Sequence, residues 1–188
     1  MLFPLEGVQE VARLNEYLSS ASRTQLELTE ATVTRVEHAG MGYRGCVDTA
    51  SLFAQDEGML VGSTSAGGIL VCAEVHYLPY MNLRPFRVNA GAVHSYVWTP
   101  EGRTAYITDL EVGTQVLAVN TAGVARPVLV GRVKTEVRPL RLIVADAGGT
   151  RINVLLQDDW HVRIFDANGD VRNCSTVEPG DKLLSHIC

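Results

Sequence analysis

Polar side chains that could bind an anion and transform it gather in one short stretch, residues 84–97. Arg84, Arg87, Asn89 and His94 stand there among small and apolar residues, so they do not belong to a solvated run of charge. Arginine binds carboxylates and phosphates through paired charge-assisted hydrogen bonds. A histidine moves protons near neutral pH, and an amide can polarise a carbonyl group. The stretch therefore predicts a site that holds an anionic substrate and moves protons on it.

The spacing of the two arginines leaves two interpretations open. Side chains three positions apart in a strand point to opposite faces, so Arg84 and Arg87 reach one ligand only if the chain bends near Pro85. Alternatively, both arginines are structural and pair with Glu74 or Asp48. His94 has a similar alternative, because a lone histidine in an apolar strand is more often a core residue than a catalyst.

Two carboxylates are expected to converge on the same stretch. Asp48 could cap a turn with its short side chain or serve as a carboxylate for base or metal chemistry. Glu74 shares a face with His76 if residues 71–76 form a strand, and the two could then bind a divalent metal or exchange a proton. A surface position for Glu74 and His76 is the alternative.

The loop at residues 62–68 is a further candidate for anion binding. Its backbone N–H groups, together with Ser63 and Ser65, could cradle an anion, although a flexible hairpin loop has the same composition. The loop has no Lys and is not a P-loop, and no G-x-G-x-x-G dinucleotide fingerprint follows a strand in this chain.

The elements that must position these side chains are strands rather than helices. Hydrophobic residues make up 46% of the 188 residues, which suffices for a buried core, and 17 Gly and 7 Pro separate short apolar runs. Leu5 to Leu18 has the apolar period of a helix. We therefore expect an N-terminal helix and connector over residues 1–23. Residues 24–188 are expected to form a mainly β domain, a small barrel or sandwich of short antiparallel strands.

Turns and an internal repeat divide this β region. Gly40, Gly42 and Gly45 predict a flexible turn, and residues 120–123 and 166–169 predict hairpin turns, because Asn and Gly tolerate positive φ. Short strands are expected at 128–133 and 140–145, among others. Residues 110–117 and 177–184 resemble each other, with a Gly ahead of an apolar strand in each copy.

Composition excludes some classes of function and favours a cytoplasmic location. The net charge is −5 and no Lys/Arg stripe stands out, which disfavours nucleic acid as a partner. No apolar run is long enough to span a bilayer, and the start lacks the basic region of a signal peptide. The four cysteines, Cys46, Cys72, Cys174 and Cys188, form no C-x-x-C pair and indicate reduced thiols.

Taken together, several blocks of this chain resemble the 3-dehydroquinate synthase II family. They occur in the family's order from Leu28 onward, and the block around Asn89 is the most specific. The blocks are Gly45–Thr49, Glu57–Ser63, Arg84–His94, Gly131–Lys134, Leu155–Gln157 and Glu178–Asp181.

The resemblance implies a ring-closing enzyme of the shikimate pathway or of secondary metabolism. Members of the family remove the amine of a linear seven-carbon amino-deoxy-keto acid oxidatively with NAD⁺ and cyclise the product to 3-dehydroquinate. Similar proteins close a phosphorylated amino-keto chain to 3-amino-4-hydroxybenzoate without net oxidation. We expect a carboxylated keto acid as the small-molecule substrate. The expected catalytic residues are His94, Glu74, Asp48 and Asn89, and the expected substrate-binding residues are Arg84, Arg87, Ser63 and Ser65.

The chain also departs from the family pattern. It matches only the C-terminal half of the family's length, Ala50 replaces a second cysteine, and Cys72 replaces a histidine ahead of Glu74. These departures argue against NAD as cofactor and favour a specialised cyclase, with Mn²⁺ or Mg²⁺ as the other cofactor considered. The apolar start and the apolar end of the chain predict an exposed patch, and we expect a homodimer or a complex with a separate N-terminal-half protein to cover it. The alternative is a non-catalytic half-enzyme that binds an anionic keto acid.

Overall fold

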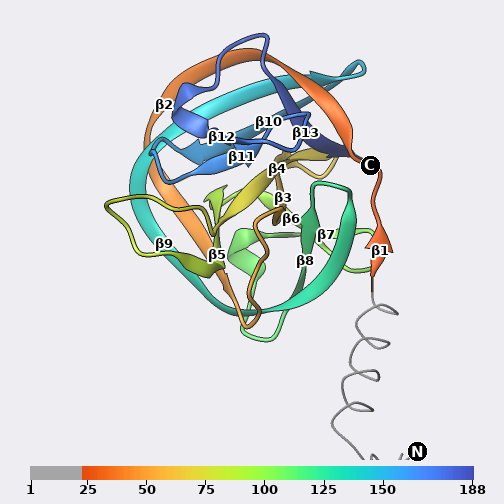
Figure 1. Cartoon of the computed structure of the whole chain (residues 1–188), viewed down its shortest axis with the longest axis vertical. Helices are drawn as coiled ribbons and strands as arrows, with labels where there is room; N and C mark the ends of the chain where they lie inside the picture. Colours follow the sequence, from red (N-terminus) through yellow and green to blue (C-terminus); the bar gives the residue numbers. More distant parts are fainter. Residues whose placement is uncertain (1–22) are drawn as a thin grey trace, which may run out of the picture.

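Residues 23–188 are described by a computed structural model, in which antiparallel strands predominate (Figure 1). The mainly β fold predicted from the sequence is confirmed. The predicted helix at Leu5–Leu18, and with it the proposed N-terminal segment, falls on residues outside this range. The strands are β1 (Thr24–Gln25), β2 (Thr29–Thr49), β3 (Glu57–Thr64), β4 (Gly67–Glu74), β5 (Arg84–Ala92), β6 (Tyr96–Thr99), β7 (Arg103–Tyr106), β8 (Gln115–Asn120), β9 (Val124–Ala147), β10 (Thr150–Gln157), β11 (Arg163–Phe165), β12 (Val171–Asn173) and β13 (Lys182–Ile187).

Six of these strands close into a barrel. Strand β4 pairs with β13, β13 with β2, β2 with β9, β9 with β8, β8 with β3, and β3 again with β4. Strand β5 lies between β2 and β4 at the end of the barrel opposite β13. Closure pairs the strands on both sides and leaves the ring no free edge. The barrel therefore supplies a rigid scaffold on which β5, β2 and β9 lie side by side.

Two strands are much longer than the sequence predicted, and in Figure 1 they arch around the whole molecule. Strand β2 has 21 residues and β9 has 24. The predicted turn at Gly40, Gly42 and Gly45 is wrong, since all three lie inside β2 and pair with β9. Gly40 adopts φ +84° at a register shift, so its glycine accommodates a bulge rather than a reversal of the chain. The strands predicted separately at 128–133 and 140–145 are both parts of β9.

The interior of the barrel is apolar because alternate residues of each strand point inward. Val47 of β2 pairs with Val88 of β5, both are fully buried, and both belong to the main hydrophobic cluster. Strand β10 pairs with the last third of β9 and contacts β3 and β5. Close packing there requires Gly91, whose added Cβ would lie 2.3 Å from the backbone oxygen of Leu155.

The internal repeat predicted from the sequence is a structural repeat. The two 3₁₀ helices η1 (Ile107–Asp109) and η2 (Cys174–Thr176) each lead through a turn into a strand, β8 and β13 respectively. Gly113 and Gly180 have φ +91° and +97° at equivalent turn positions, and their N–H groups donate to Val130 and Val33 over 2.8 Å in both cases.

The repeat extends to the pairing of the strands. Strands β6 and β11 pair with β3 and β4 respectively, while β5 and β10 pair with β2 and β9. Strand β8 lies between β3 and β9, and β13 lies between β4 and β2. The order β2, β5, β6, β7, η1, β8 is thus repeated as β9, β10, β11, β12, η2, β13. In residues 23–188, no helix is long and apolar enough to cross a membrane.

Candidate functional site

A polar face on the outside of strands β5, β2 and β9 is the candidate site. Residues that pair across antiparallel strands project from the same side of the sheet, and residues two apart in one strand share that side. The pairings therefore place three rows of polar side chains on the face opposite Val47 and Val88. The rows are Arg87–Asp48–Arg132, Asn89–Cys46–Lys134 and Arg44–Glu136.

A pocket of about 250 Å³ opens on this face. We call it the cationic pocket, because five Lys or Arg side chains line it against three carboxylates. Three segments border it in addition to the polar face: the end of β4, the loop before β5 and the turn after β10. Its lining residues are Arg44, Cys46, Glu74, Met81, Arg84, Arg87, Lys134, Glu136, Arg138, Gln157, Asp159 and His161.

Asp48 is the centre of the first row. Arg87 Nε and Nη2 donate to its two carboxylate oxygens at 2.6 and 2.9 Å, and Arg132 Nε and Nη2 donate to Oδ2 at 2.9 and 2.5 Å. Burial alone would raise the pKa of Asp48, but the hydrogen bonds from the two arginines outweigh it and lower that pKa. The hydrogen bond to Asp48 raises the pKa of Arg87 in turn. Both groups are therefore charged at neutral pH.

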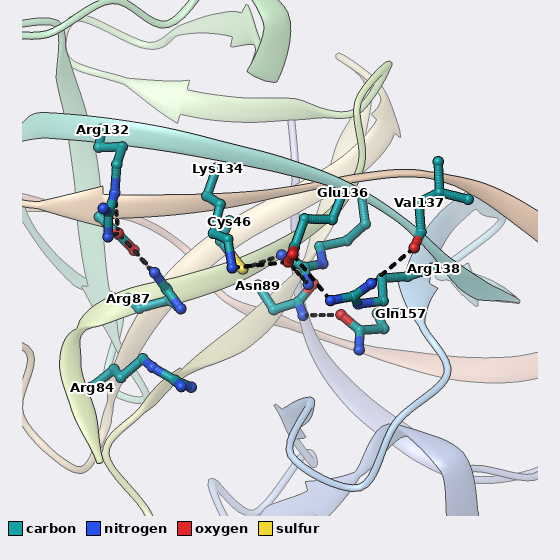
Figure 2. A network of polar contacts seen from close by, with 12 residues as sticks. Cys46, Arg84, Arg87, Asn89, Arg132, Lys134, Glu136, Val137, Arg138 and Gln157 are labelled. Carbon is teal, nitrogen blue, oxygen red and sulfur yellow. Dashed lines mark hydrogen bonds and ion pairs between the residues drawn. The ribbon is translucent and has the colours of Figure 1, made fainter. Parts of the chain in front are cut away.

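Glu136, which belongs to the third row, lies within ion-pair distance of three cations (Figure 2). Its carboxylate lies 3.2 Å from Arg44 and 3.1 Å from both Lys134 and Arg138. A hydrogen bond from Lys134 is the main cause of the lowered pKa of Glu136. No second carboxylate pairs with these three cations within residues 23–188. Three positive charges against one negative charge leave a surplus of two, which favours an anion in the pocket.

Cys46 lies beside this group as a neutral thiol. Arg44 Nη1 donates to its Sγ at 2.6 Å, and the side chain is buried. Burial raises the pKa of Cys46 to about 11, although the charge of Arg44 opposes the shift. The thiolate form that a nucleophile requires is therefore scarce at neutral pH.

A chain of hydrogen bonds crosses the pocket from Asn89 towards His161. Asn89 Nδ2 donates to Gln157 Oε1 at 2.9 Å (Figure 2), and Gln157 Nε2 donates to Asp159 Oδ2 at 3.2 Å. Since the Asp159 carboxylate can only accept, it fixes the orientation of the Gln157 amide and, through it, that of Asn89. Asn89 Oδ1 is left buried without a partner in the described part of the chain, so it can accept from a ligand.

The far side of the pocket carries Glu74 between two basic groups. Its Oε2 accepts from Arg84 Nη1 at 3.1 Å, and its Oε1 lies 3.8 Å from His161 Nε2. The Glu74 side chain is almost fully buried, while that of Arg84 is partly exposed. His161 Nδ1 lies 2.9 Å from Asp159 Oδ1, so carboxylates flank both ring nitrogens.

The structure brings together five of the eight site residues predicted from the sequence: Arg84, Arg87, Glu74, Asp48 and Asn89. Both arginines line the pocket, because the pairing of β5 with β4 is irregular between Arg84 and Val88. Both arginines also form ion pairs within the protein, Arg84 with Glu74 and Arg87 with Asp48. These are the structural pairs that the sequence offered as the alternative to substrate binding.

The other three predicted residues lie elsewhere. His94 is exposed in the turn after β5 rather than on a strand, and it does not line the pocket. Ser63 and Ser65 lie at the tip of the β3–β4 hairpin, whose other end carries Glu74. A strand of that length spans roughly 20 Å, which separates the serines from the pocket. The strand that was expected to include His76 ends at Glu74.

Sequence reasoning missed nine of the twelve lining residues, Cys46 and Met81 among them. Lys134, Glu136 and Arg138 continue a period-two polar pattern from Arg132, which predicts one exposed face of a strand. Arg44 shares this pattern with Cys46 and Asp48, but the supposed glycine turn concealed it. Gln157 ends strand β10 and stands in the block Leu155–Gln157 that carries the family resemblance. Asp159 and His161 follow that strand and have no comparable signal in the sequence.

A metal site does not emerge from the described side chains. Across residues 23–188, no three His, Cys, Asp or Glu side chains gather in a way that could hold a metal ion. No chemical step below depends on a metal.

Comparison with known proteins identifies the family to which this fold and face belong. Residues 30–188 match the family model described as the 3-dehydroquinate synthase II C-terminal domain. The chain therefore belongs to the 3-dehydroquinate synthase II family, which confirms the resemblance noted in the sequence. No solved structure matches it.

Named relatives show the range of the family. The chain is 50% identical over 171 residues to a 3-amino-4-hydroxybenzoic acid synthase of Streptomyces griseus, which covers 90% of this chain and 43% of the relative. It is 44% identical over 178 residues to a 3-dehydroquinate synthase of Methanosphaera stadtmanae, covering 95% and 50% respectively. A 3-dehydroquinate synthase homolog of Persephonella marina is 42% identical over 182 residues, covering 97% and 55%. The chain thus spans about half the length of the curated relatives it matches.

Proposed function

We propose that this chain forms the substrate-binding and ring-closing part of an enzyme of the 3-dehydroquinate synthase II type. Its substrate would be a linear seven-carbon amino-deoxy-keto acid, and its product 3-dehydroquinate or 3-amino-4-hydroxybenzoate. The names of the relatives from Methanosphaera stadtmanae and Streptomyces griseus, a 3-dehydroquinate synthase and a 3-amino-4-hydroxybenzoic acid synthase, support these two products.

The observation that carries the proposal is the surplus of positive charge around Glu136 in a chain of net charge −5. This network presents more cations than carboxylates to an open pocket. Arg138 and Lys134 remain partly exposed there and can reach a ligand, while the Arg44 side chain is 5% exposed. A carboxylate of the substrate would bind to these cations.

The rest of the pocket suits the other groups of an amino-keto acid. Asn89 Oδ1 is a buried acceptor in need of a donor, which an amine or hydroxyl group of the substrate would supply. The sequence suggested that Asn89 polarises a carbonyl group through its N–H. In the structure one Asn89 N–H already donates to Gln157, while Asn89 Oδ1 has no partner in the described part of the chain. The arrangement therefore supports Asn89 as a hydrogen-bond acceptor for the substrate as well as a donor.

Product analysis tests the proposal. The purified chain would be incubated with the seven-carbon amino-deoxy-keto acid, with and without NAD⁺ and with and without Mn²⁺ or Mg²⁺, and products would be identified by mass. Product only with NAD⁺ supports the dehydroquinate route, and product without NAD⁺ supports the aminohydroxybenzoate route. Arg138→Gln should weaken binding of the acid about five- to ten-fold. The matched control Arg103→Gln, from an exposed pair with Glu101, should not.

A second candidate is a half-enzyme that binds the acid without transforming it. In this candidate a separate N-terminal-half protein or a second copy of this chain would complete the site. Calorimetric binding of the acid without any product supports it. No binding of the acid by the wild-type chain would refute both candidates.

A further inference from the structure

We propose that His161 is the proton-transfer residue of the cationic pocket, that Asp159 positions it, and that Glu74 offsets its charge. The inference rests on the proposed function, since it assigns a step in that reaction. It also replaces His94, the histidine that the sequence suggested for this role.

The backbone around His161 fixes the position of the ring. Val162 N donates to Asp159 O at 3.1 Å and closes a turn, and His161 N donates to Asp159 Oδ1 at 3.3 Å. The same carboxylate oxygen lies 2.9 Å from the ring Nδ1. Asp159 also accepts from Gln157, so several hydrogen bonds hold its carboxylate in place. Burial alone would raise the pKa of Asp159, but these hydrogen bonds, chiefly from His161, lower it.

The charged Asp159 determines which nitrogen of His161 carries the proton. A carboxylate only accepts, so Nδ1 is the protonated nitrogen of the neutral ring and Nε2 has the free lone pair. Nε2 faces Glu74 Oε1 at 3.8 Å, which is too long for a hydrogen bond. Two acceptors thus face each other in the pocket, and a donor atom of the substrate can approach both of them from the open side of the pocket.

This arrangement has the parts that proton transfer requires. A base must be oriented by a third group and must face the substrate, and the site must tolerate the charge that the base gains. Asp159 orients the His161 ring through Nδ1, and the ring lines the pocket. The Glu74 carboxylate lies on the opposite side of the ring, near Nε2. Arg84 donates to the second oxygen of Glu74 and thereby holds that carboxylate in position.

The step is a proton transfer coupled to ring closure. His161 Nε2 accepts the proton from a substrate carbon next to a carbonyl group, and the electron pair of that C–H bond forms the new C–C bond to a second carbonyl carbon. The π electrons of the second carbonyl move to its oxygen, which then takes the proton back from Nε2. One C–H and one C=O π bond break while one C–C and one O–H bond form, so no oxidant or reductant is needed for this step.

Another histidine in the chain provides a matched control. His38 Nδ1 lies 2.8 Å from Asp158 Oδ2, so it makes the same kind of histidine–carboxylate pair. Its side chain is 79% exposed, against 14% for His161, and it does not line the cationic pocket. The substitution His161→Asn retains an N–H that can donate to Asp159 while removing the base. His38→Asn makes the same change outside the pocket.

Two measurements test the proposal. Long-range ¹H–¹⁵N spectra of the full chain labelled in histidine should show the neutral His161 ring with its proton on Nδ1. In D₂O, the wild-type chain should exchange deuterium into the seven-carbon amino-deoxy-keto acid at the carbon next to its carbonyl group. His161→Asn should slow this exchange by about 100-fold or more, with the calorimetric Kd of the acid changed less than about three-fold. His38→Asn and His94→Asn should leave the exchange within about two-fold of wild type.

The outcomes separate this proposal from the proposed function. A proton on Nε2, exchange by His161→Asn at the wild-type rate, or loss of exchange in His94→Asn instead would each overturn the role of His161. Binding of the acid by wild type without any exchange would do the same and leave the binding function standing. Failure of wild type to bind the acid would overturn the proposed function, and the role of His161 in it would fall as well.

Discussion

The buried cluster around Asp48 predicts an unequal response to the removal of its three members. Asp48 and Arg87 have side chains only 6% and 9% exposed, whereas Arg132 is 62% exposed. Asp48→Asn leaves Arg87 buried without a charged partner, and breaking a buried pair in this way costs about 3–5 kcal/mol of unfolding free energy. Arg87→Met leaves Asp48 with its two hydrogen bonds from Arg132, so we expect a smaller loss of about 2 kcal/mol. Arg132→Met removes an exposed partner and should cost about 1 kcal/mol or less.

Chemical denaturation of the four proteins measures these differences, and thermal unfolding provides a second assay. For a chain of this length, 1 kcal/mol corresponds to about 2–4 °C in Tm, so Asp48→Asn should lower Tm by about 6–20 °C. The double variant Asp48→Asn, Arg87→Met should lose less unfolding free energy than the two single variants lose together. Once one charge of the pair has been removed, removing the other no longer leaves a buried charge without its partner. The reasoning fails if Asp48→Asn and Arg132→Met lose equal stability, or if the two losses at Asp48 and Arg87 simply add.

Three other predictions follow from single contacts. Glu136→Gln frees three cations, so the seven-carbon acid should bind roughly five-fold more tightly in calorimetry at low salt; an unchanged Kd would contradict the charge argument. Gly91→Ala places a Cβ 2.3 Å from a backbone oxygen at φ +79° and should cost about 3–5 kcal/mol in denaturation, while Gly149→Ala, at φ +94° with open space, should cost only about 1–2 kcal/mol. Asp48 and Glu57 have pKa values lowered by their arginine partners against the opposing effect of burial, so their stabilisation is complete above the ordinary carboxyl pKa and is lost as the pH falls through the folded-state pKa. Unfolding free energy should therefore decline below about pH 4, and less steeply in Asp48→Asn.

Local sequence signals predicted the parts of this fold that depend on neighbouring residues. The hairpin turn at residues 120–123 forms as expected, with the Asn120 side chain accepting from Ala122 N and Val124 N and Gly123 at φ +81°. The repeat at 110–117 and 177–184 was visible because equivalent turns need the same residue types. The glycines at 40, 42 and 45 misled, because pairing with β9 determines their conformation and no local pattern reveals that partner.

The residues of the candidate site likewise fall into those that local sequence signals indicated and those that depend on distant partners. Arg87 and Asn89 were found because they stand close together in one block of sequence. Lys134 and Glu136 were missed because they reach the site through the register of β9 against β2, and a register set by pairing across some 90 residues cannot be read from either strand alone. His161 was missed because a histidine in a turn becomes a candidate base only once its distances to Asp159 and Glu74 are known.

The repeated strand order has a consequence for stoichiometry. A chain built from two similar halves presents two related faces, β5–β2–β9 from one half and β10–β9–β2 from the other. The second face has its own hollow, lined in part by His38 and Arg141, but Asp158 lies within ion-pair distance of both side chains. Only the first face gathers three cations on one carboxylate. Each chain should therefore bind a single molecule of the acid. The second of the two repeated faces would then have a structural role in the barrel and no role in binding.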